Sequence, residues 1–548
     1  MEAILHNEQL MFVDENVEAL ARHYSNRILA KHPEVGQQSS SLGQTGEVDD
    51  LVYKSSLRVF NDRSFGPEYV AYSMYQRLGF DDLFKKLGIA ERQRKLMSLS
   101  VIGKLVDPKS ENATRLWARE LSAIDELLEE DLSRLGHNSL YRISDTIYKH
   151  KDEIETHLCA KERSIFNLKE SLCLYDLTNT FLEGSAKSIP KAKFGRSKEK
   201  RSDCRLLTLG MVVNELGFCK KTNVLEGSVS EPHTLQEMIE SLSANLEQGS
   251  FPTVVMDAGI ATKENLNYLR TKGYYYLCVS RTKPLADPNI DPAAMRVVHK
   301  DRYNLVQAQV FKTDDELLLY CHSQKMESKE RAMQDSYCHR FEDDLEKIIA
   351  SLSKRYSNKS YGKIMQRIGR LKERYSSIGR FYHIEVSETN GTVISIEYHK
   401  VKQEEEEDRF SGSYWLRSSY SEWDEQQIWD TYMMLNRIEA AFRSLKHKLA
   451  YHSTEKRAEA HIFIAVLAYH LLNSICLQLR QDGINESWNT VRARMSTHRR
   501  VSITAMSRDN TIALERITST AEPYHLKIYK ALNMSPNPVI KALKNRKM

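Results

Sequence analysis

The sequence has no CxxC pair, no uninterrupted apolar run close to the roughly 18 residues of a membrane-spanning helix, and no strong excess of one charge. The first twenty residues carry acids within their apolar pattern, which is unlike a signal peptide. Without CxxC spacing, the cysteines resemble reduced cytosolic thiols more than a disulfide framework or a zinc site. These absences predict a soluble intracellular protein with no membrane partner. The cysteines are Cys159, Cys173, Cys204, Cys219, Cys278, Cys321, Cys338 and Cys476.

With 79 Lys and Arg against 74 Asp and Glu, the chain has a formal net charge of +5. That balance permits a nucleic-acid partner without requiring one, so local clusters of charge must decide. The composition, 41% hydrophobic and 28% charged, is ordinary for a soluble globular protein. At 548 residues the chain is too long for one hydrophobic core, so we expect roughly two to four domains.

The stretch 431–449 predicts the helix around which the chain is organised. One face carries apolar residues at helical spacing, which predicts packing against a core. The neighbouring face presents Glu439 near Arg443 and Lys446, with Tyr432 earlier on the same face. A carboxylate beside cations suits a metal-bound acid near a phosphate backbone, and the alternative is a surface helix with an ordinary Glu–Arg pair. The apolar residues are Ile438, Ala441, Phe442 and Leu445.

The N-terminal part predicts a linker followed by a helical domain. Residues 1–50 begin with a helical pattern and end in a polar stretch rich in Gly, Ser and Gln. From 51 to 168, apolar residues recur at spacings of three and four, which predicts helices throughout. This domain either binds DNA or forms a structural, dimerising bundle with a solvated charged face. Its basic candidates are Lys85, Lys86, Arg92, Arg94 and Lys95.

Between 169 and 282 the pattern changes to short apolar runs separated by turns and amphipathic helices. Three strands, a helix, a strand, a helix and a further strand predict an α/β fold with a mixed sheet and flanking helices. That order matches the ribonuclease-H-like plan, in which carboxylates lie on the first strand, at the end of the fourth and on a late helix. The first apolar run ends in Asp176, and the run TVVM ends in Asp257.

The rest of the chain predicts an interruption and a return of this catalytic domain. Residues 283–410 alternate like strands around two charged helices, which predicts a β-rich insertion domain with a helical hairpin. The catalytic domain resumes at 411–482, with a strongly apolar helix that we expect to be buried behind the sheet. His461 on that helix is predicted to be a satisfied core histidine. Residues 483–548 form a basic tail of mixed pattern, in which WNTVRARMSTHRR and IKALKNRKM predict helix fragments or a loose end.

Three carboxylates, Asp176, Asp257 and Glu439, form the candidate metal site. An isolated buried charge is costly unless it is paired or bound to a metal. Carboxylate oxygens suit a hard cation that keeps water ligands, meaning Mg²⁺ or Mn²⁺. Two such ions, roughly 3.5–4 Å apart, activate an attacking oxygen and stabilise a leaving one in phosphodiester chemistry. Each Asp alone has the alternative of capping a turn, but the joint pattern favours the metal site.

These residues carry a resemblance to the DDE transposases of bacterial insertion sequences, in the group with a Tyr-x2-Arg-x3-Glu-x6-Lys signature (insertion-sequence family four and its relatives). Tyr432, Glu439 and Lys446 match that spacing, whereas Leu435 stands at the position of the Arg. The segments YDLTNTFLEG and VVMDAGIATKENLNYLRTKGYYYL resemble the family's first-Asp and second-Asp segments. The resemblance extends over roughly residues 55–480, and the long second gap fits the β-rich insertion of this group.

The resemblance implies metal-dependent cleavage at insertion-sequence ends and transfer of the freed 3′-OH into target DNA. Asp176, Asp257 and Glu439 would bind two Mg²⁺ or Mn²⁺ ions in each active site. The implied partners are the terminal inverted repeats and target DNA, bound by a homodimer once two ends are synapsed. The implied location is the bacterial cytoplasm, at the nucleoid when bound to DNA. The candidate DNA-binding residues are Tyr432, Arg443, Lys446, Lys193, Arg196, Lys198, Lys200 and Arg201.

Several alternatives stay open at this point. The basic loop Lys187–Arg201 either follows DNA phosphates or is a solvated surface loop. The chain could be a ribonuclease-H-like nuclease that cuts without joining ends. It could also be an inactivated transposase kept as a DNA-binding protein, for which Leu435 is the only support.

Overall fold

The structure is a computed structural model that describes residues 53–169, 171–182, 184–195, 202–242, 251–280, 282, 290–354, 356–401, 411–445, 454–506 and 512–538. The chain divides into two compact units. One unit comprises Met1–Arg63 and Arg499–Ser519, and the other comprises Ser64–His498 and Thr520–Met548.

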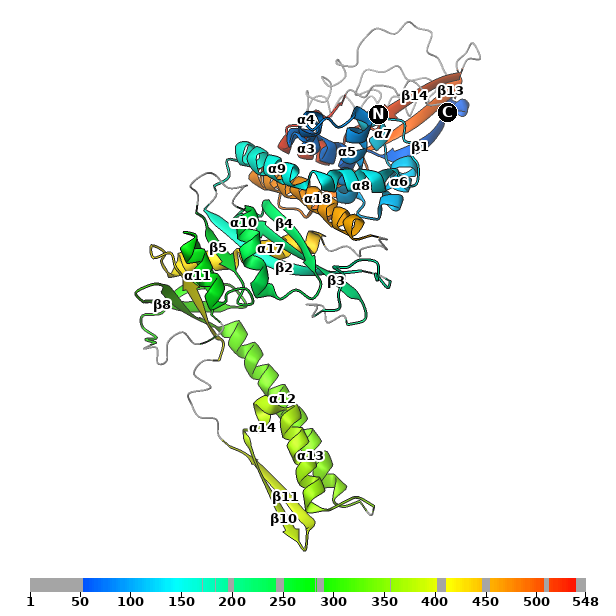
Figure 1. The fold of residues 1–548 in the computed structure, drawn as a ribbon. Helices are drawn as coiled ribbons and strands as arrows, with labels where there is room; N and C mark the ends of the chain where they lie inside the picture. Colours follow the sequence, from blue (N-terminus) through cyan, green and yellow to red (C-terminus); the bar gives the residue numbers. More distant parts are fainter. Residues whose placement is uncertain are drawn as a thin grey trace, which may run out of the picture. The chain divides into compact units, whose positions relative to one another are not determined.

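The larger unit is built on a nine-stranded mixed sheet of order β4-β3-β2-β5-β6-β12-β9-β8-β7 (Figure 1). Strands β2, β3 and β4 are antiparallel neighbours, whereas β5 and β6 run parallel to β2. The predicted mixed sheet with flanking helices is therefore confirmed, and its first five strands are compatible with the ribonuclease-H-like plan. The strands are β2 (Leu172–Leu182), β3 (Arg205–Val213), β4 (Cys219–Glu226), β5 (Thr253–Met256), β6 (Tyr275–Val279), β7 (Arg296–Lys300), β8 (Leu305–Lys312), β9 (Leu317–Ser323) and β12 (Ser413–Ser418).

Alternation along the strands sends side chains to two different cores. On one face, Leu174 and Val255 join the core that includes α17 (Leu435–Leu445) and α18 (Glu455–Gln481). On the other face, Tyr175 and Met256 pack with α10 (Leu235–Leu242) and α11 (Lys263–Thr271). The central strands are thus covered on both faces, which explains why they are apolar without a polar side.

Helix α18 is the apolar helix predicted behind the sheet, and it is buried. Its most apolar 18-residue window has a mean hydropathy of 1.8, enough to cross a membrane by length and composition alone, but 83% of that window is buried inside the protein. It packs against α3, α5 and α8, which come from the predicted helical domain (Figure 1). Burial in this core accounts for its composition. The helices of that domain are α3 (Gly66–Arg77), α4 (Phe80–Lys86), α5 (Glu91–Val106), α6 (Glu111–Glu120), α7 (Ile124–Leu128), α8 (Ser139–Lys149) and α9 (Lys151–Phe166).

The predicted insertion is smaller than 283–410. Strands β7, β8 and β9 belong to the main sheet, because β9 pairs along β12 and is buried on both faces. What remains is a helical hairpin with a β-ribbon and its own core around Phe341, Ile364 and Tyr382 (Figure 1). We call residues 324–400 the hairpin module. It consists of α12 (Gln324–Ser351), α13 (Tyr361–Arg374), α14 (Ser376–Gly379), β10 (Tyr382–Thr389) and β11 (Thr392–Lys400).

The C-terminal segment is folded up to residue 538, apart from the undescribed stretch 507–511. The helix fragment predicted in WNTVRARMSTHRR is confirmed as α19. Helix α20 buries Ile528 and Tyr529, and the Tyr529 hydroxyl lies 2.6 Å from His498 Nδ1. In the smaller unit, β13 lies between β1 and β14 in a three-stranded sheet. The predicted segment IKALKNRKM lies outside the described residues. The elements are η3 (Lys54–Ser56), β1 (Arg58–Ser64), α19 (Trp488–Met495), β13 (Arg499–Met506), β14 (Ile512–Thr518) and α20 (Pro523–Ala531).

Candidate active site

The helix predicted at 431–449 is two helices in the structure. Helix α16 (Glu425–Met433) begins at a capping box on Asp424, and a turn at Met434 separates it from α17. Tyr432 therefore lies in the last turn of α16, whereas Glu439 lies on α17. The sequence pattern did not reveal this break, because the apolar spacing continues across it.

The predicted apolar face of α17 is confirmed for the side chains that the structure describes. Ile438, Ala441 and Phe442 are at most 4% exposed and join the core that contains Leu174. Helix α17 lies against β2. Packing of this face leaves Glu439 exposed on the helix.

Asp176 and Asp257 occupy neighbouring places on two parallel strands. Tyr175 on β2 is in register with Met256 on β5, and each Asp is the next residue of its chain. Neighbouring strands are about 4.8 Å apart. By alternation, Asp176 faces the same side of the sheet as Leu174, the side on which α17 packs. Asp176 Oδ1 accepts a hydrogen bond from the Leu177 amide at 2.7 Å.

The two strand positions differ from the prediction in one respect. Asp257 follows the last residue of β5, as expected, and its Oδ1 accepts from the Ala258 amide at 2.7 Å. Asp176, however, lies inside β2 rather than at its end. The strand continues because residues beyond Asp176 keep pairing with β3 as far as Leu182, opposite Arg205.

Tyr432 links Glu439 to the two aspartates. Burial raises the pKa of the Tyr432 hydroxyl, and the negative charges of Asp257, Asp176 and Glu439 raise it further. All three carboxylates therefore lie within electrostatic range of one phenol, which stays protonated at neutral pH. A cluster of this kind accumulates negative charge beside a neutral hydrogen-bond donor.

The donor chemistry fits a hard divalent cation, since all three groups offer carboxylate oxygens. Within the described part of the chain, neither Asp257 nor Glu439 has an ion-pair partner to offset its charge. Over the same residues, no three His, Cys, Asp or Glu side chains converge closely enough to hold a metal ion. The acids are thus gathered on one side of the sheet without forming a closed ligand cage.

The predicted DNA-binding residues are only partly described. The side chain of Arg443 is not described, and Lys446, Arg196, Lys198, Lys200 and Arg201 lie outside the described residues. Lys193 is half-buried, and its backbone bridges to Leu206 on β3. Lys191 in the same loop contacts Glu459 and lies 3.8 Å from Glu455 on α18, so it anchors the loop to the protein.

The comparison with solved structures gives a distant likeness. A solved structure that resembles this chain is the cryo-electron microscopy structure of a piggyBac transposase synaptic complex with hairpin DNA. The TM-score is 0.32 at 10% sequence identity, over 78% of this chain and 69% of the other. No protein-family model and no curated protein matches the sequence. A likeness at this level carries no inference about function, so the resemblance to insertion-sequence transposases stays a prediction.

Two polar networks away from the acids were not predicted as such. Immediately before β9, Glu316 accepts two hydrogen bonds of 2.7 Å from Arg417 and one of 2.6 Å from Arg270. Burial alone would raise the pKa of Glu316, but hydrogen bonds from Arg417 and Tyr276 hold it below its ordinary value. The local sequence does not predict this network, because only the folded sheet brings its members together.

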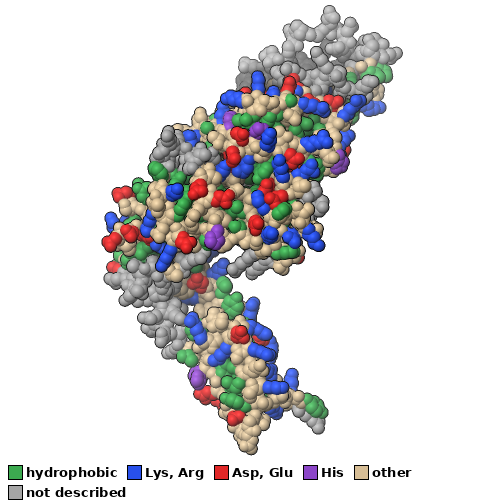
Figure 2. All heavy atoms as spheres, in the orientation of Figure 1, with side chains coloured by type: hydrophobic (Ala, Val, Ile, Leu, Met, Phe, Trp, Pro, Cys, Tyr) green, Lys and Arg blue, Asp and Glu red, His purple; other side chains and the backbone are tan. Residues whose placement is uncertain are grey.

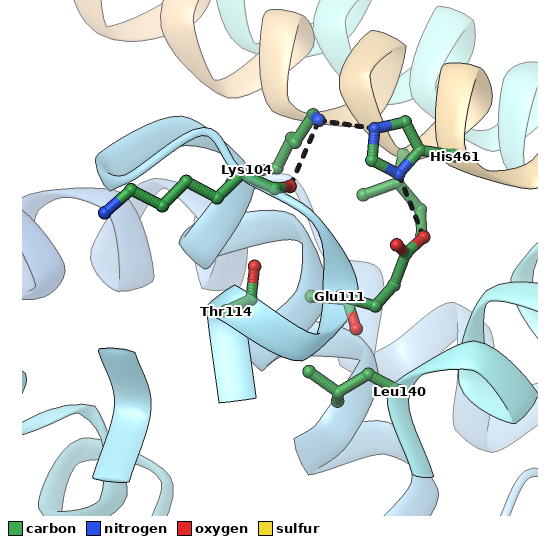
Figure 3. Close-up of a pocket in the computed structure, with 8 residues that line it drawn as sticks. Lys104, Glu111, Thr114, Leu140 and His461 are labelled. Atoms are coloured by element: carbon green, nitrogen blue, oxygen red, sulfur yellow. Dashed lines mark hydrogen bonds and ion pairs between the residues drawn. The ribbon is translucent and has the colours of Figure 1, made fainter. Parts of the chain in front are cut away.

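The second network confirms His461 as a satisfied core histidine. Its Nδ1 lies 2.9 Å from Glu111 Oε1, and its Nε2 lies 2.8 Å from Lys104 Nζ (Figure 3). These side chains line a cavity of about 10 Å³, room for about one water molecule. Burial lowers the pKa of Lys104 to about 8, although Glu111 acts in the opposite direction. The network joins α5, α6 and α18 through buried polar groups.

Proposed function

We propose that this protein is a DDE transposase, which cuts DNA at insertion-sequence ends and transfers the freed 3′-OH to target DNA. The observation that carries the proposal is the register of Tyr175 with Met256 on the parallel strands β2 and β5, which puts Asp176 and Asp257 directly after two paired residues. The charge of Glu439, like the charges of the two aspartates, raises the pKa of the Tyr432 hydroxyl. The strand order of the central sheet supports the same conclusion.

In this proposal Asp176, Asp257 and Glu439 hold Mg²⁺ or Mn²⁺. The ions would lower the pKa of a nucleophilic water and stabilise the leaving oxygen. Tyr432 has a raised pKa and so remains a neutral donor, able to give a hydrogen bond to a phosphate oxygen without adding charge. Arg443, Lys446 and the basic loop would contact the DNA backbone.

A test uses the purified full-length protein with labelled duplexes that carry the sequences flanking its gene, with and without Mg²⁺. We expect nicking at the element's end followed by joining to a second DNA, and loss of both in Asp176→Asn, Asp257→Asn and Glu439→Gln, with DNA binding retained. Asp430→Asn is the matched control, because Asp430 is an exposed acid on α16, close in sequence to Tyr432.

Each other outcome has a definite meaning. Cutting without joining would identify a nuclease. Binding without cutting in either metal would identify an inactive protein that only holds DNA. Cleavage at the normal rate in any one of the three variants would remove that residue from the site.

A further inference from the structure

A large net positive charge lies in the hairpin module, away from the three carboxylates in sequence. Residues 354–380 contain nine Lys or Arg and a single acid, Glu373. This 27-residue segment thus has a net charge of +8, more than the +5 of the whole chain. Figure 2 shows Lys and Arg side chains gathered along the helical hairpin.

On helix α13, four of these cations lie on one face. Its apolar residues Ile364, Ile368 and Leu371 are at most 5% exposed and pack in the core of the module. Four exposed cations recur at spacings of four, three and four, so they form a single row along the helix. We call this row the cationic stripe, and it consists of Lys363, Arg367, Arg370 and Arg374.

Little within the described module neutralises the stripe. Arg374 lies 3.3 Å from Asp344, and Arg367 donates to the Ser351 hydroxyl at 2.9 Å. Over the described residues, Lys363 and Arg370 have no ion-pair partner. Other acids of α12 are engaged elsewhere: Glu342 and Glu346 accept from the hydroxyls of tyrosines on β10 and β11. The stripe therefore keeps most of its charge.

The surface beside the stripe is open. Gly362 and Gly369 lie about 100° round the helix from Lys363 and Arg370, and a Cβ at either position would meet nothing within 4 Å. Glycine inside a helix costs about 1 kcal/mol relative to alanine, and here it leaves room for a partner to approach the backbone closely. The exposed apolar side chains of α13, Tyr361 and Met365, lie outside the row of cations, whereas a protein partner would need an apolar centre to the interface.

We propose that the cationic stripe binds the backbone phosphates of duplex DNA. The proposal rests on DNA being the substrate of the proposed function, and it names a contact surface separate in sequence from the catalytic carboxylates. From Lys363 to Arg374 the helix rises about 16 Å, which matches about five base pairs at 3.4 Å each. A helix about 10–12 Å across also fits a major groove about 12 Å wide.

The test measures DNA binding by the full-length protein without divalent metal, so that no cleavage occurs, on a random-sequence duplex at several salt concentrations. The stripe variant is Lys363→Gln, Arg367→Gln and Arg370→Gln combined. Arg374 is left intact because Asp344 already pairs with it. The matched control is Lys325→Gln, Lys329→Gln and Lys400→Gln combined, which removes the same charge from exposed positions of the same module.

We expect the slope of log affinity against log salt to fall by about 2.7 in the stripe variant, since each phosphate contact contributes about 0.9. The control should change the slope by less than one third of that. Equal slopes in the two variants would overturn the proposal. The proposal would also be overturned if polyglutamate displaced the labelled duplex from the wild-type protein as readily as unlabelled DNA does. That result would favour an acidic protein partner.

This outcome is separable from the test of the proposed function. Stripe-dependent binding without metal-dependent cleavage would support the cationic stripe as a DNA-binding surface and contradict the proposed transposase function. Normal cleavage with an unchanged slope in the stripe variant would support the transposase function and contradict the role of the stripe. The conservative variant Lys363→Arg should keep the wild-type slope, because it keeps the charge. An equal melting temperature for the stripe variant and the control excludes loss of folding as the cause.

Discussion

Asp176 and Asp257 stand next to each other on parallel strands, because Tyr175 and Met256 immediately before them are in register. Two carboxylates on neighbouring strands repel each other when both are ionised. Glu439 adds a third negative charge within range of Tyr432. The arrangement therefore favours the binding of a positive ion, and this has consequences beyond catalysis.

Metal binding should stabilise the folded protein through these acids. At a concentration one hundred times its Kd, a ligand specific for the folded state adds about 2.7 kcal/mol. We expect Mg²⁺ or Mn²⁺ to raise the Tm of the wild type, and Asp257→Asn to abolish that rise. Without metal, Asp257→Asn should melt above the wild type, because it removes one of the repelling charges.

Differential scanning fluorimetry with and without metal measures both effects. Asp430→Asn serves as the control and should keep the full metal-dependent rise. A rise of equal size in wild type and Asp257→Asn would show that the metal binds elsewhere.

Because the pKa of Lys104 is lowered, we expect the free energy of unfolding to depend on pH in the alkaline range. Its pKa in the folded protein is about 8, below the ordinary 10.5. Between these values the unfolded chain binds a proton that the folded chain does not, so stability rises with pH in this window. Relative to Lys104→Met, which cannot titrate, the wild type should gain about 3 kcal/mol from pH 8 to 10.5, because one pKa unit is about 1.4 kcal/mol.

Urea unfolding of both proteins at several pH values measures this difference, and the other titrating groups cancel in the comparison. A difference that stays constant from pH 8 to 10.5 would mean that Lys104 titrates normally in the fold.

Phe442 connects the packing of α17 to the position of Glu439, one helical turn earlier. Phe442 is 4% exposed, and replacing a buried Phe by Ala typically costs about 3–5 kcal/mol. We expect Phe442→Ala to lower the free energy of unfolding by this amount. It should also slow cleavage although it removes no carboxylate, because a loosened α17 no longer holds Glu439 in one position. Phe442→Leu should lower the free energy of unfolding and the cleavage rate by less. Cleavage at the wild-type rate in a clearly destabilised Phe442→Ala would separate the helix packing from the site.

The sequence predicted those features that depend on local periodicity. The buried face of α17 follows from the spacing of Ile438, Ala441 and Phe442. The succession of strands and helices along the chain as far as β6 follows from apolar runs between turns. The turn at Met434 leaves no trace in that spacing. Pairing partners are also absent from a local pattern. Alternation identifies β8 and β9 as strands, but it does not say that β9 pairs with β12, about 100 residues later.

The same limit applies to pairs of charged residues that are distant in sequence. Glu316 looks like a turn residue before an apolar strand, and its partners Arg270 and Arg417 lie on different elements. Lys104, Glu111 and His461 likewise come from three helices. Because such residues are charged, the sequence alone favours a position on the surface for them. Only the fold shows that they are buried together.

Glu316 provides a final prediction, because it is 8% exposed and bonded to two guanidinium groups. Removing one partner of a buried ion pair typically costs about 3–5 kcal/mol, and the partial exposure of both arginines places Glu316→Gln near the lower end. Since the pKa of Glu316 is held below its ordinary value, its contribution is present above the ordinary carboxyl pKa and is lost as pH falls through the folded value. The difference in the free energy of unfolding between wild type and Glu316→Gln should therefore shrink in acid.

Asp315→Asn, at an exposed neighbouring position, should change the free energy of unfolding by less than about 0.5 kcal/mol at any pH. A Glu316→Gln cost that is the same at neutral and acidic pH would mean that shape, and not charge, is what the network supplies.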